Sequence, residues 1–295
     1  MFNSATALLK GIQGKFQNAL DAAPQTELEK VAFQAPSEEL FESFWIPGTT
    51  PAIQKLVDRL DFGSMQDFEL KVFNDDFGAG FKVDKNVLND SKKYLSGGVE
   101  LHIRGMLEKY KSFNSKIMAS ALVANGTAFD GTAFFATSRP NLLTGGNVID
   151  NLYTGTGTTQ AQITADFEGA LAKMLGFRDS NDDALNAGAK PAVIIPIHLL
   201  PIFRKILVSQ YFAGGVDNLN QNAAEIIVNW SQAATDNDWY IANLASALPP
   251  FIITNREQPV WDVDDPKFGK WINYGYTFRK GIGYGNPISI IKINN

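Results

Sequence analysis

One long stripe of apolar residues in positions 99–125 constrains the fold more than any other feature of this chain. The residues step by three and four positions, which places them on one side of an α-helix, and Gly126 supplies the stop. They are Val99, Ile103, Met106, Leu107, Tyr110, Phe113, Ile117 and Ala121. Such a helix would be about 40 Å long at about 1.5 Å per residue. One long helix that is apolar on one side only is an unusual component of a compact enzyme.

A long β-hairpin is predicted just before this helix, within residues 60–88. Apolar and polar residues alternate at 68–72 and again at 81–84, and this period of two predicts two strands. Residues 74–80 between them are rich in Asn, Asp and Gly, which favour turns. Because an isolated two-stranded hairpin is only marginally stable in water, we expect residues 57–90 to rest on an adjacent subunit, and to be dispensable for folding yet needed for stable particles.

The first 40 residues have the composition of an arm. A short run of helical spacing around Leu8 to Phe16 is interrupted by glycines, and Pro24 and Pro36 break any continuation. An aromatic cluster then precedes the turn signal Pro47-Gly48. Its members are Phe41, Phe44, Trp45 and Ile46. Burying each large aromatic is worth roughly 1.5–3 kcal/mol, so the cluster should dock on its own long helix or on a neighbouring subunit.

Removing residues 1–40 distinguishes two roles for the arm. If the arm serves assembly, the shortened chain stays folded and assembles poorly. If the arm covers the core of its own chain, the shortened chain unfolds. We expect the first outcome.

Further along, the pattern predicts an α+β chain with strands crowded toward its C-terminal part. A second helix is expected over about 160–176, a buried strand at 192–195 and a helix from Ile197 to Phe212 after Pro196. The strands expected after it are 225–230, 239–243, 251–254, 260–263, 271–278 and 288–293.

Composition excludes several classes of function. The chain has 295 residues, 45% of them hydrophobic, which supports a real core, and a net charge of −5, which argues against a protein that grips nucleic acid by neutralising phosphates. It contains no cysteine, so disulfides, thiolate metal sites and a cysteine nucleophile are excluded. Pro196 and Pro201 interrupt the longest apolar run, and no signal-peptide pattern is visible, so we expect a soluble cytosolic protein.

No motif in the chain predicts catalysis, a cofactor or a metal. His102 and His198 lie about a hundred positions apart and favour structural roles. Asp179, Asn181 and Asp183 have the spacing of a calcium loop, but the later ligand positions do not fit. The glycine run 281–285 is predicted to be a bend between strands, because no helix follows it. The acidic pairs 75–76, 182–183 and 264–265 are expected in solvated turns.

Three stretches carry a resemblance to a known family. They are Phe16-Gln17-Asn18-Ala19-Leu20-Asp21-Ala22-Ala23-Pro24, the segment from Asn125 to Phe135 followed by Arg139-Pro140, and Lys190-Pro191-Ala192-Val193-Ile194-Ile195-Pro196. With the order of elements, they resemble the Hong Kong 97-type fold of tailed-phage shells, and within it the major head subunit of Mu-like phages. The family often has His before the Pro where this chain has Arg139.

The resemblance implies a division of the chain and a function. Residues 1–45 would form an N-terminal arm, 57–90 an extended loop, 91–160 with 256–295 a peripheral domain carrying the spine helix, and 161–255 an axial domain. The protein would be a major capsid protein of a tailed phage or prophage that self-assembles into an icosahedral shell enclosing double-stranded DNA. Candidate assembly residues are Phe41, Phe44, Trp45, Phe73, Phe77 and Phe81.

The same resemblance implies the partners. They would be other copies in hexamers and pentamers, scaffold, portal and other head proteins, and packaged DNA without sequence-specific binding. The location would be the virion, assembled in the host cytoplasm, with no cofactor and no membrane. Two alternatives stay open at this point. One is an α/β enzyme with a ligand site at the Ile194–Pro196 strand-to-helix junction, and the other is a cellular nanocompartment shell of the same fold.

Overall fold

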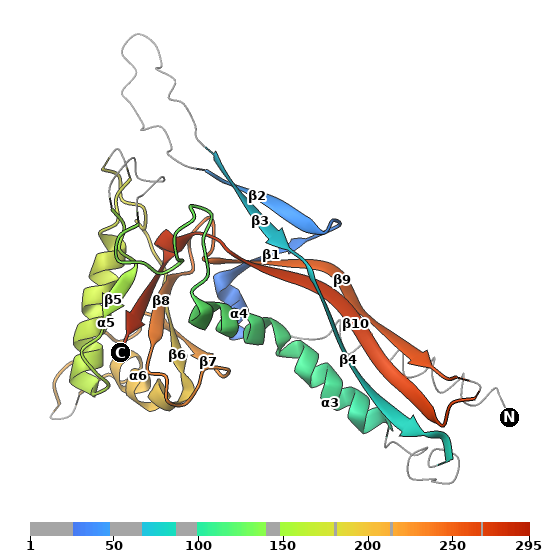
Figure 1. The fold of residues 1–295 in the computed structure, drawn as a ribbon. Helices are drawn as coiled ribbons and strands as arrows, with labels where there is room; N and C mark the ends of the chain where they lie inside the picture. Colours follow the sequence, from blue (N-terminus) through green and yellow to red (C-terminus); the bar gives the residue numbers. More distant parts are fainter. Residues whose placement is uncertain are drawn as a thin grey trace.

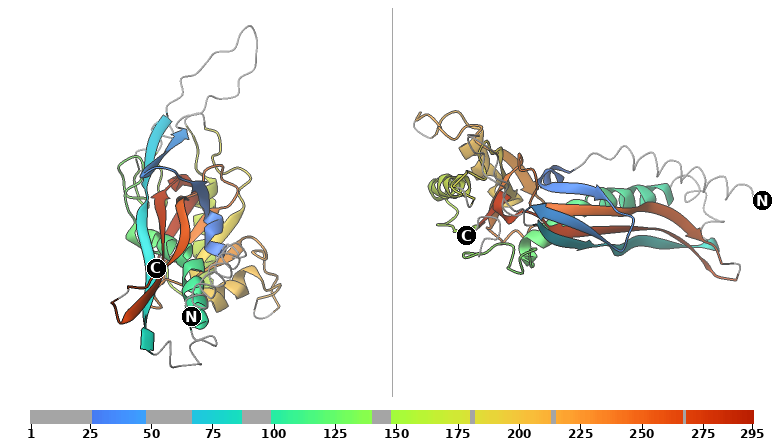
Figure 2. Two further views of the ribbon diagram at one scale, coloured as in Figure 1. Left: turned by 90° about the vertical axis from the view of Figure 1, so that its right-hand side faces the viewer. Right: turned by 90° about the horizontal axis from the view of Figure 1, so that it is seen from above.

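The computed structural model describes residues 26–47, 67–86, 99–139, 148–179, 182–212, 215–266 and 268–295. The molecule is elongated: a long sheet backed by helices extends from a body built around a second sheet (Figures 1 and 2). The strand orders are β1-β9-β10-β4 in the long sheet, β5-β11-β8-β6-β7 in the body and β2-β3 in a short ribbon.

The long sheet is built on two 14-residue antiparallel strands, β9 (Phe251–Asp264) and β10 (Trp271–Tyr284). Strand β4 (Asp75–Asp84) pairs with β10 along its whole length, and β1 (Ala32–Pro36) pairs in parallel with the start of β9. The sequence predicts two separate strands within β9 and a bend at residues 281–285. Both predictions are wrong, since β9 is continuous and β10 runs through to Tyr284.

The prediction of a hairpin within residues 60–88 is also wrong. Strand β3 (Asp67–Phe73) pairs with β2 (Phe41–Pro47), and only Asn74 separates it from β4, which pairs with β10 instead. Asn74 is buried, and its side-chain amide donates to Ser37 Oγ at 2.7 Å and accepts from Thr254 Oγ1 at 2.6 Å. These hydrogen bonds keep the backbone extended at the point where the chain passes from pairing with β2 to pairing with β10. The turn formers at 75–80 therefore lie in a strand of the subunit's own sheet.

Two glycines allow β3 to cross the face of β10. A Cβ atom on Gly281 would lie 2.2 Å from the carbonyl oxygen of Phe73, and one on Gly283 would lie 2.4 Å from Cγ2 of Val72. Any larger residue would force the two strands apart, since real Cβ atoms do not approach that closely. The glycine run is therefore required by a close approach of two backbones rather than by a bend.

The long helix of the sequence prediction is two helices in line, α3 (Val99–Lys111) and α4 (Phe113–Ala124), with Ser112 between them. Helix α3 covers the aromatic face of the long sheet, whereas α4 packs Met118 and Leu122 between the two sheets. Helix α4 ends at Asn125, which adopts the left-handed conformation with φ of 48° one residue before the expected glycine.

The N-terminal part of the described chain is packed on the same subunit. The short 3₁₀ helix η1 (Glu27–Val31) buries Leu28 and Val31 against α4 and the body sheet. Residues from 26 onward within the expected arm thus contribute to the subunit core. Residues 1–25 lie outside the described part of the chain, as do residues 48–66, which connect β2 to β3.

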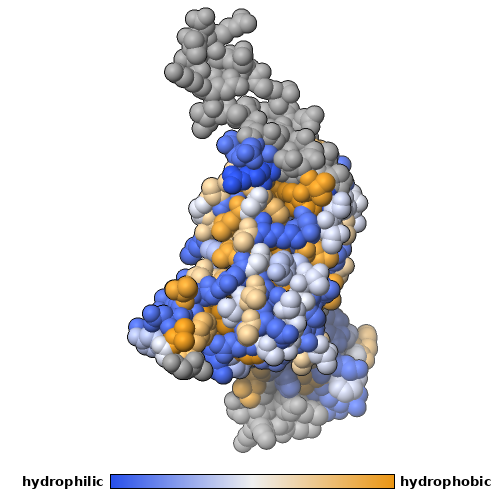
Figure 3. All heavy atoms as spheres, turned by 90° about the vertical axis from the view of Figure 1, so that its left-hand side faces the viewer, coloured by the Kyte–Doolittle hydropathy of each residue, from blue (hydrophilic) through white to orange (hydrophobic). Residues whose placement is uncertain are grey.

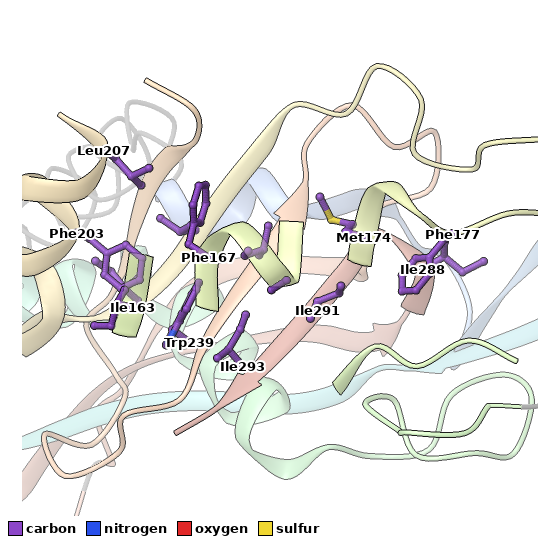
Figure 4. Packing of buried hydrophobic residues seen from close by; sticks show 14 of the residues in the cluster. Ile163, Phe167, Met174, Phe177, Phe203, Leu207, Trp239, Ile288, Ile291 and Ile293 are labelled. Atoms are coloured by element: carbon purple, nitrogen blue, oxygen red, sulfur yellow. The ribbon is translucent and has the colours of Figure 1, made fainter. Parts of the chain in front are cut away.

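The body is a five-stranded sheet with helices on one face and α4 on the other. Its strands are β5 (Leu152–Thr154), β6 (Pro191–Pro196), β7 (Glu225–Asn229), β8 (Trp239–Asn243) and β11 (Ile290–Asn294). Helices α5 (Gln160–Leu175) and α6 (Leu200–Leu207) cover the outer face. Ile163, Phe167 and Met174 of α5 point toward Trp239, Ile291 and Ile293 of the sheet, together with Phe203 and Leu207 of α6 (Figure 4).

The body matches the sequence prediction closely, with two differences. The helix expected over 197–212 is a 3₁₀ turn, η3 (Ile197–Leu199), followed by α6, which stops at Leu207. Strand β5 is the second difference, because no strand was predicted between the long helix and the helix at 160–176. A last 3₁₀ turn, η4 (Pro287–Ser289), leads into β11.

Candidate assembly surfaces

Neither histidine stands in a catalytic arrangement. His102 lies on the exposed side of α3 with its ring 5.4 Å from that of Phe81, and Nε2 of His198 lies 3.0 Å from Oδ1 of Asn237. Within the described residues, no three His, Asp or Glu side chains gather as metal ligands would. None of the helices there is long and apolar enough to span a membrane.

A buried ion pair fixes the segment between α4 and β5. Nη1 of Arg139 lies 2.7 Å from Oδ2 of Asp130, and both side chains are almost completely buried. Nη2 also donates to the carbonyl of Phe134 at 2.9 Å. Burial lowers the pKa of Arg139, and the carboxylate of Asp130 opposes this effect. Arg139, where the sequence departs from the pattern of the family it resembles, is thus held by an internal ion pair and carbonyl contacts, while its buried Nε has no partner among the described residues.

Two of the six candidate assembly residues, Phe77 and Phe81, lie on the face of β4 that meets α3. The Phe77 ring is 4.7 Å from that of Phe113 and 5.6 Å from that of Phe278. The Phe81 ring is stacked 5.2 Å from that of Tyr274. Both therefore contribute to the core cluster between α3 and the long sheet.

The other four candidates come together on the β2–β3 ribbon. Phe41 and Phe73 are cross-strand partners with ring centroids 5.5 Å apart, and Nζ of Lys71 lies 5.4 Å from the Phe41 ring centre. Phe44 points inward and packs on the body core. Trp45 points outward and is 66% exposed, and Phe73 is 58% exposed. The ribbon thus presents aromatic surface away from its own subunit.

Other exposed apolar residues lie at two further extremities and were not singled out by the sequence. One set follows α6 and β7, and the other is at the turn between β9 and β10. They are Val208, Tyr211, Val216, Leu219, Trp230 and Phe268. Leu219 is 92% exposed. Single apolar residues in polar loops give no periodic signal, so only the structure shows where they gather.

The surface of the body is mixed rather than uniformly apolar. At the end formed by α5 and α6, apolar patches are interrupted by polar side chains (Figure 3). Standard protein–protein interfaces have about this mixture of apolar and polar area. Exposed apolar residues at the extremities of an elongated subunit are suited to contacts with several neighbouring copies rather than to one large dimer interface.

The fold is that of phage capsid proteins. The structure is similar to the mature capsid protein of bacteriophage PhiM1, at 9% identity and a TM-score of 0.61, over 92% of this chain and 87% of the other. It is also similar to the procapsid of bacteriophage JBD30, at 17% identity and a TM-score of 0.55, over 99% of this chain and 75% of the other. At such identities the likeness shows the fold, which is the Hong Kong 97-type.

A third similar structure is the virus-like particle from Pyrococcus furiosus, at 14% identity and a TM-score of 0.53, over 97% of this chain and 98% of the other. No curated protein matches the sequence significantly. The family model described as Mu-like prophage major head subunit gpT matches residues 5–162, more than half of the chain. This protein therefore belongs to the Mu-like major head subunit family and is a phage-type major capsid protein.

Proposed function

We propose that the chain self-assembles into an icosahedral shell that encloses the double-stranded DNA of a tailed phage or prophage. The observation that carries this proposal is the match to the Mu-like major head subunit family over residues 5–162. Copies in rings of six and five would form the shell, and it would be assembled in the host cytoplasm with scaffold and portal proteins. The net charge of −5 limits adhesion between the wall and packaged DNA.

The exposed aromatic side chains support a role for the β2–β3 ribbon in assembly. Leaving Trp45 and Phe73 in water costs roughly 1.5–3 kcal/mol each relative to burial. In a closed shell, each copy offers the same ribbon to the next copy in a ring, so this cost is removed once per subunit. Phe41 belongs to the same surface, whereas Phe44, Phe77 and Phe81 would act indirectly, by holding the ribbon and the long sheet in place.

The division into domains stays a proposal, and the sheet topology suggests one change of boundary. The long sheet with α3 would be the peripheral domain, and the body with α5 and α6 the axial domain. Strand β11 lies between β5 and β8 in the body sheet. The C-terminal boundary of the peripheral domain therefore fits better near residue 285 than at 295. The extended loop is best described as β2, β3 and the chain between them.

A nanocompartment shell is the second candidate function. It is favoured by the likeness to the virus-like particle from Pyrococcus furiosus over nearly the whole of both chains. The family match points to a head subunit instead, so the nanocompartment ranks below the head. The contents of native particles decide between them, because a head contains DNA and a nanocompartment contains protein.

The assembly surface is tested by paired substitutions in the full-length chain. We expect Trp45→Ser with Phe73→Ser to leave the circular dichroism spectrum unchanged while the fraction of subunits in particles falls at least about tenfold, since two lost apolar contacts act at every interface. Leu101→Ser, a similarly exposed apolar residue on α3, is the matched control. Normal particles from the double variant would contradict the proposed role of the ribbon.

A further inference from the structure

The long sheet has one covered and one open face. Tyr274, Tyr276 and Phe278 of β10 point toward α3 and are buried. The alternate residues of β10 point to the other face, as do their register partners on β4 and β9. Within the described part of the chain, β3 covers the far end of this face at Gly281 and Gly283, and no element covers the stretch before it (Figure 1).

This open stretch is a hollow with a floor of glycine. Gly80 of β4 pairs with Gly275 of β10, and Gly78 pairs with Thr277. The hollow has a volume of about 460 Å³ and is bounded on the β9 side by Val260, Asp262 and Asp264.

The floor is bare backbone. A Cβ on Gly80 would lie 2.9 Å from the carbonyl oxygen of Tyr274, and one on Gly275 would lie 3.1 Å from that of Ala79. A side chain at either position would therefore require the neighbouring strand to shift.

Strand β10 itself shows that glycines on this face allow another strand to pass close to the backbone. Where Gly281 and Gly283 face outward, β3 crosses β10 in close contact with its backbone. Gly275 lies on the same strand, six residues before Gly281, and faces the same side of the sheet. A second extended segment could therefore cross the sheet at Gly275 as closely as β3 crosses it at Gly281.

The rim of the hollow selects a cationic segment. Among the described residues, the carboxylate of Asp262 accepts only the backbone N–H of Val263, and that of Asp264 accepts the side-chain amide of Asn273 at 3.0 Å. Neither pairs with a cation among the described residues. Residues 1–25 contain Lys10 and Lys15, a single acidic residue and the apolar side chains of Leu8, Leu9, Ile12 and Phe16.

We infer that the hollow lined by Gly78, Gly80 and Gly275 receives residues 1–25 of a second copy of this chain. This inference rests on the proposed assembly function and names the site that the arm would occupy on a neighbour. Lysine side chains of the arm would pair with Asp262 and Asp264, and its apolar side chains would fill the hollow against Val260.

The position of Thr26 favours a second copy over the same chain. Its hydroxyl is hydrogen-bonded to that of Ser115 on α4. Helix α4 lies on the covered side of the long sheet, where Phe113 packs 5.0 Å from Phe278. Thr26, the first described residue, therefore lies on the opposite side of the long sheet from the hollow. Twenty-five residues can span up to about 80 Å when extended, which is enough to reach an adjacent subunit.

A photo-cross-linking residue at Val260 tests the inference in the full-length chain. Val260 is two-thirds exposed and lines the hollow. Subunits carrying p-benzoylphenylalanine there are mixed with ¹⁵N-labelled unmodified subunits before assembly, irradiated, digested and analysed by mass spectrometry. We expect cross-links to peptides of residues 1–25 that carry the ¹⁵N label. The same probe at Leu101, on α3, should not give them.

A charge reversal gives a second readout. Asp262→Lys should reduce the yield of this cross-link about tenfold, whereas Glu108→Lys on the exposed side of α3 should not change it. Cross-links confined to the probe-bearing chain, or to segments other than residues 1–25, would overturn the inference while leaving the assembly function intact. Failure of the unmodified chain to form particles would overturn the proposed function and this inference with it.

Discussion

Lys280 is a charged residue in a place that water hardly reaches. It is only 5% exposed, its Nζ donates to Oδ1 of Asn114 at 3.0 Å, and it lies 4.9 Å from the centre of the Tyr110 ring. Burial lowers its pKa from 10.5 to about 8, and the negative charge of Glu29 opposes this effect. The side chain links β10 to α4 at the expense of stability at neutral pH.

We predict that Lys280→Met stabilises the subunit at pH 7. The lowered pKa corresponds to a cost of about 3 kcal/mol, and loss of the bond to Asn114 offsets part of the gain, so we expect about 1–2 kcal/mol. Below pH 8 both folded and unfolded chains hold the proton and the cost is fully present. Between pH 8 and 10.5 the unfolded chain binds more protons, so wild-type stability rises with pH and the advantage of the variant disappears.

Urea denaturation of both proteins at pH 7 and pH 10 measures this difference. Lys116→Met, an exposed lysine of α4, serves as the control for loss of one positive charge. An advantage of Lys280→Met that is equal at the two pH values would show that its cause is packing rather than buried charge.

The Arg139–Asp130 pair gives a prediction of opposite sign. Arg139→Met leaves the Asp130 carboxylate buried without its cation, and we expect a loss of about 3–5 kcal/mol in the free energy of unfolding. Combining it with Asp130→Asn should recover part of this loss, because no uncompensated charge is then buried. Equal losses in the single and double variants, measured by urea denaturation, would count against this explanation.

At the scale of elements, the crossing of β3 over β10 depends on glycine. Gly281→Ala places a methyl group 2.2 Å from the carbonyl oxygen of Phe73, so we expect a loss of about 2–4 kcal/mol. Gly105→Ala in α3 is the matched control. A Cβ at Gly105 meets no atom within 4 Å, and alanine there should stabilise the helix by about 0.5–1 kcal/mol.

Thermal unfolding of the two variants measures both effects. A Gly281→Ala protein as stable as wild type would mean that β3 does not pass close to β10 in solution.

The elements that the sequence predicted well are those with local signals. Helix α5 has a Thr159–Gln162 capping box and a glycine at its end, and β8 is a short, continuous apolar run. The hairpin failed because alternation shows which residues share a face but not which strand is the partner. Strand β3 pairs with β2 and strand β4 pairs with β10, which is some 190 positions further along the chain.

For the same reason, the sequence predicted only part of the candidate assembly surface. The sequence marked Phe77 and Phe81 as candidate assembly residues but placed Phe77 in a turn, and it could not show that both lie on the side of β4 that meets α3. Trp45 and Phe73 lie on the side that no element of the described chain covers. The hollow at Gly275 depends on three strands in register, so no local pattern reveals it.

At the scale of the whole molecule, two truncations separate folding from assembly. Removing residues 1–25 leaves every described contact in place, so we expect a folded subunit that assembles poorly. Removing residues 1–40 also deletes Leu28 and Val31, which are buried, and strand β1. The structure therefore changes the expectation drawn from the sequence, in which the chain without residues 1–40 stays folded: we now expect this deletion to lower the free energy of unfolding by about 3–6 kcal/mol. Circular dichroism and sedimentation of both chains provide the comparison.

If the chain without residues 1–40 were as stable as the full chain, the packing of η1 and β1 on the core would be wrong. If the chain without residues 1–25 formed normal particles, the arm would have no role in assembly.

Electron microscopy of the purified full-length chain, combined with sedimentation velocity, tests self-assembly directly. We expect closed particles with icosahedral symmetry, built from elongated subunits whose β2–β3 ribbons contact their neighbours. A single species that sediments as a monomer at all concentrations and shows no particles on the grid, with or without a scaffold protein, would contradict it.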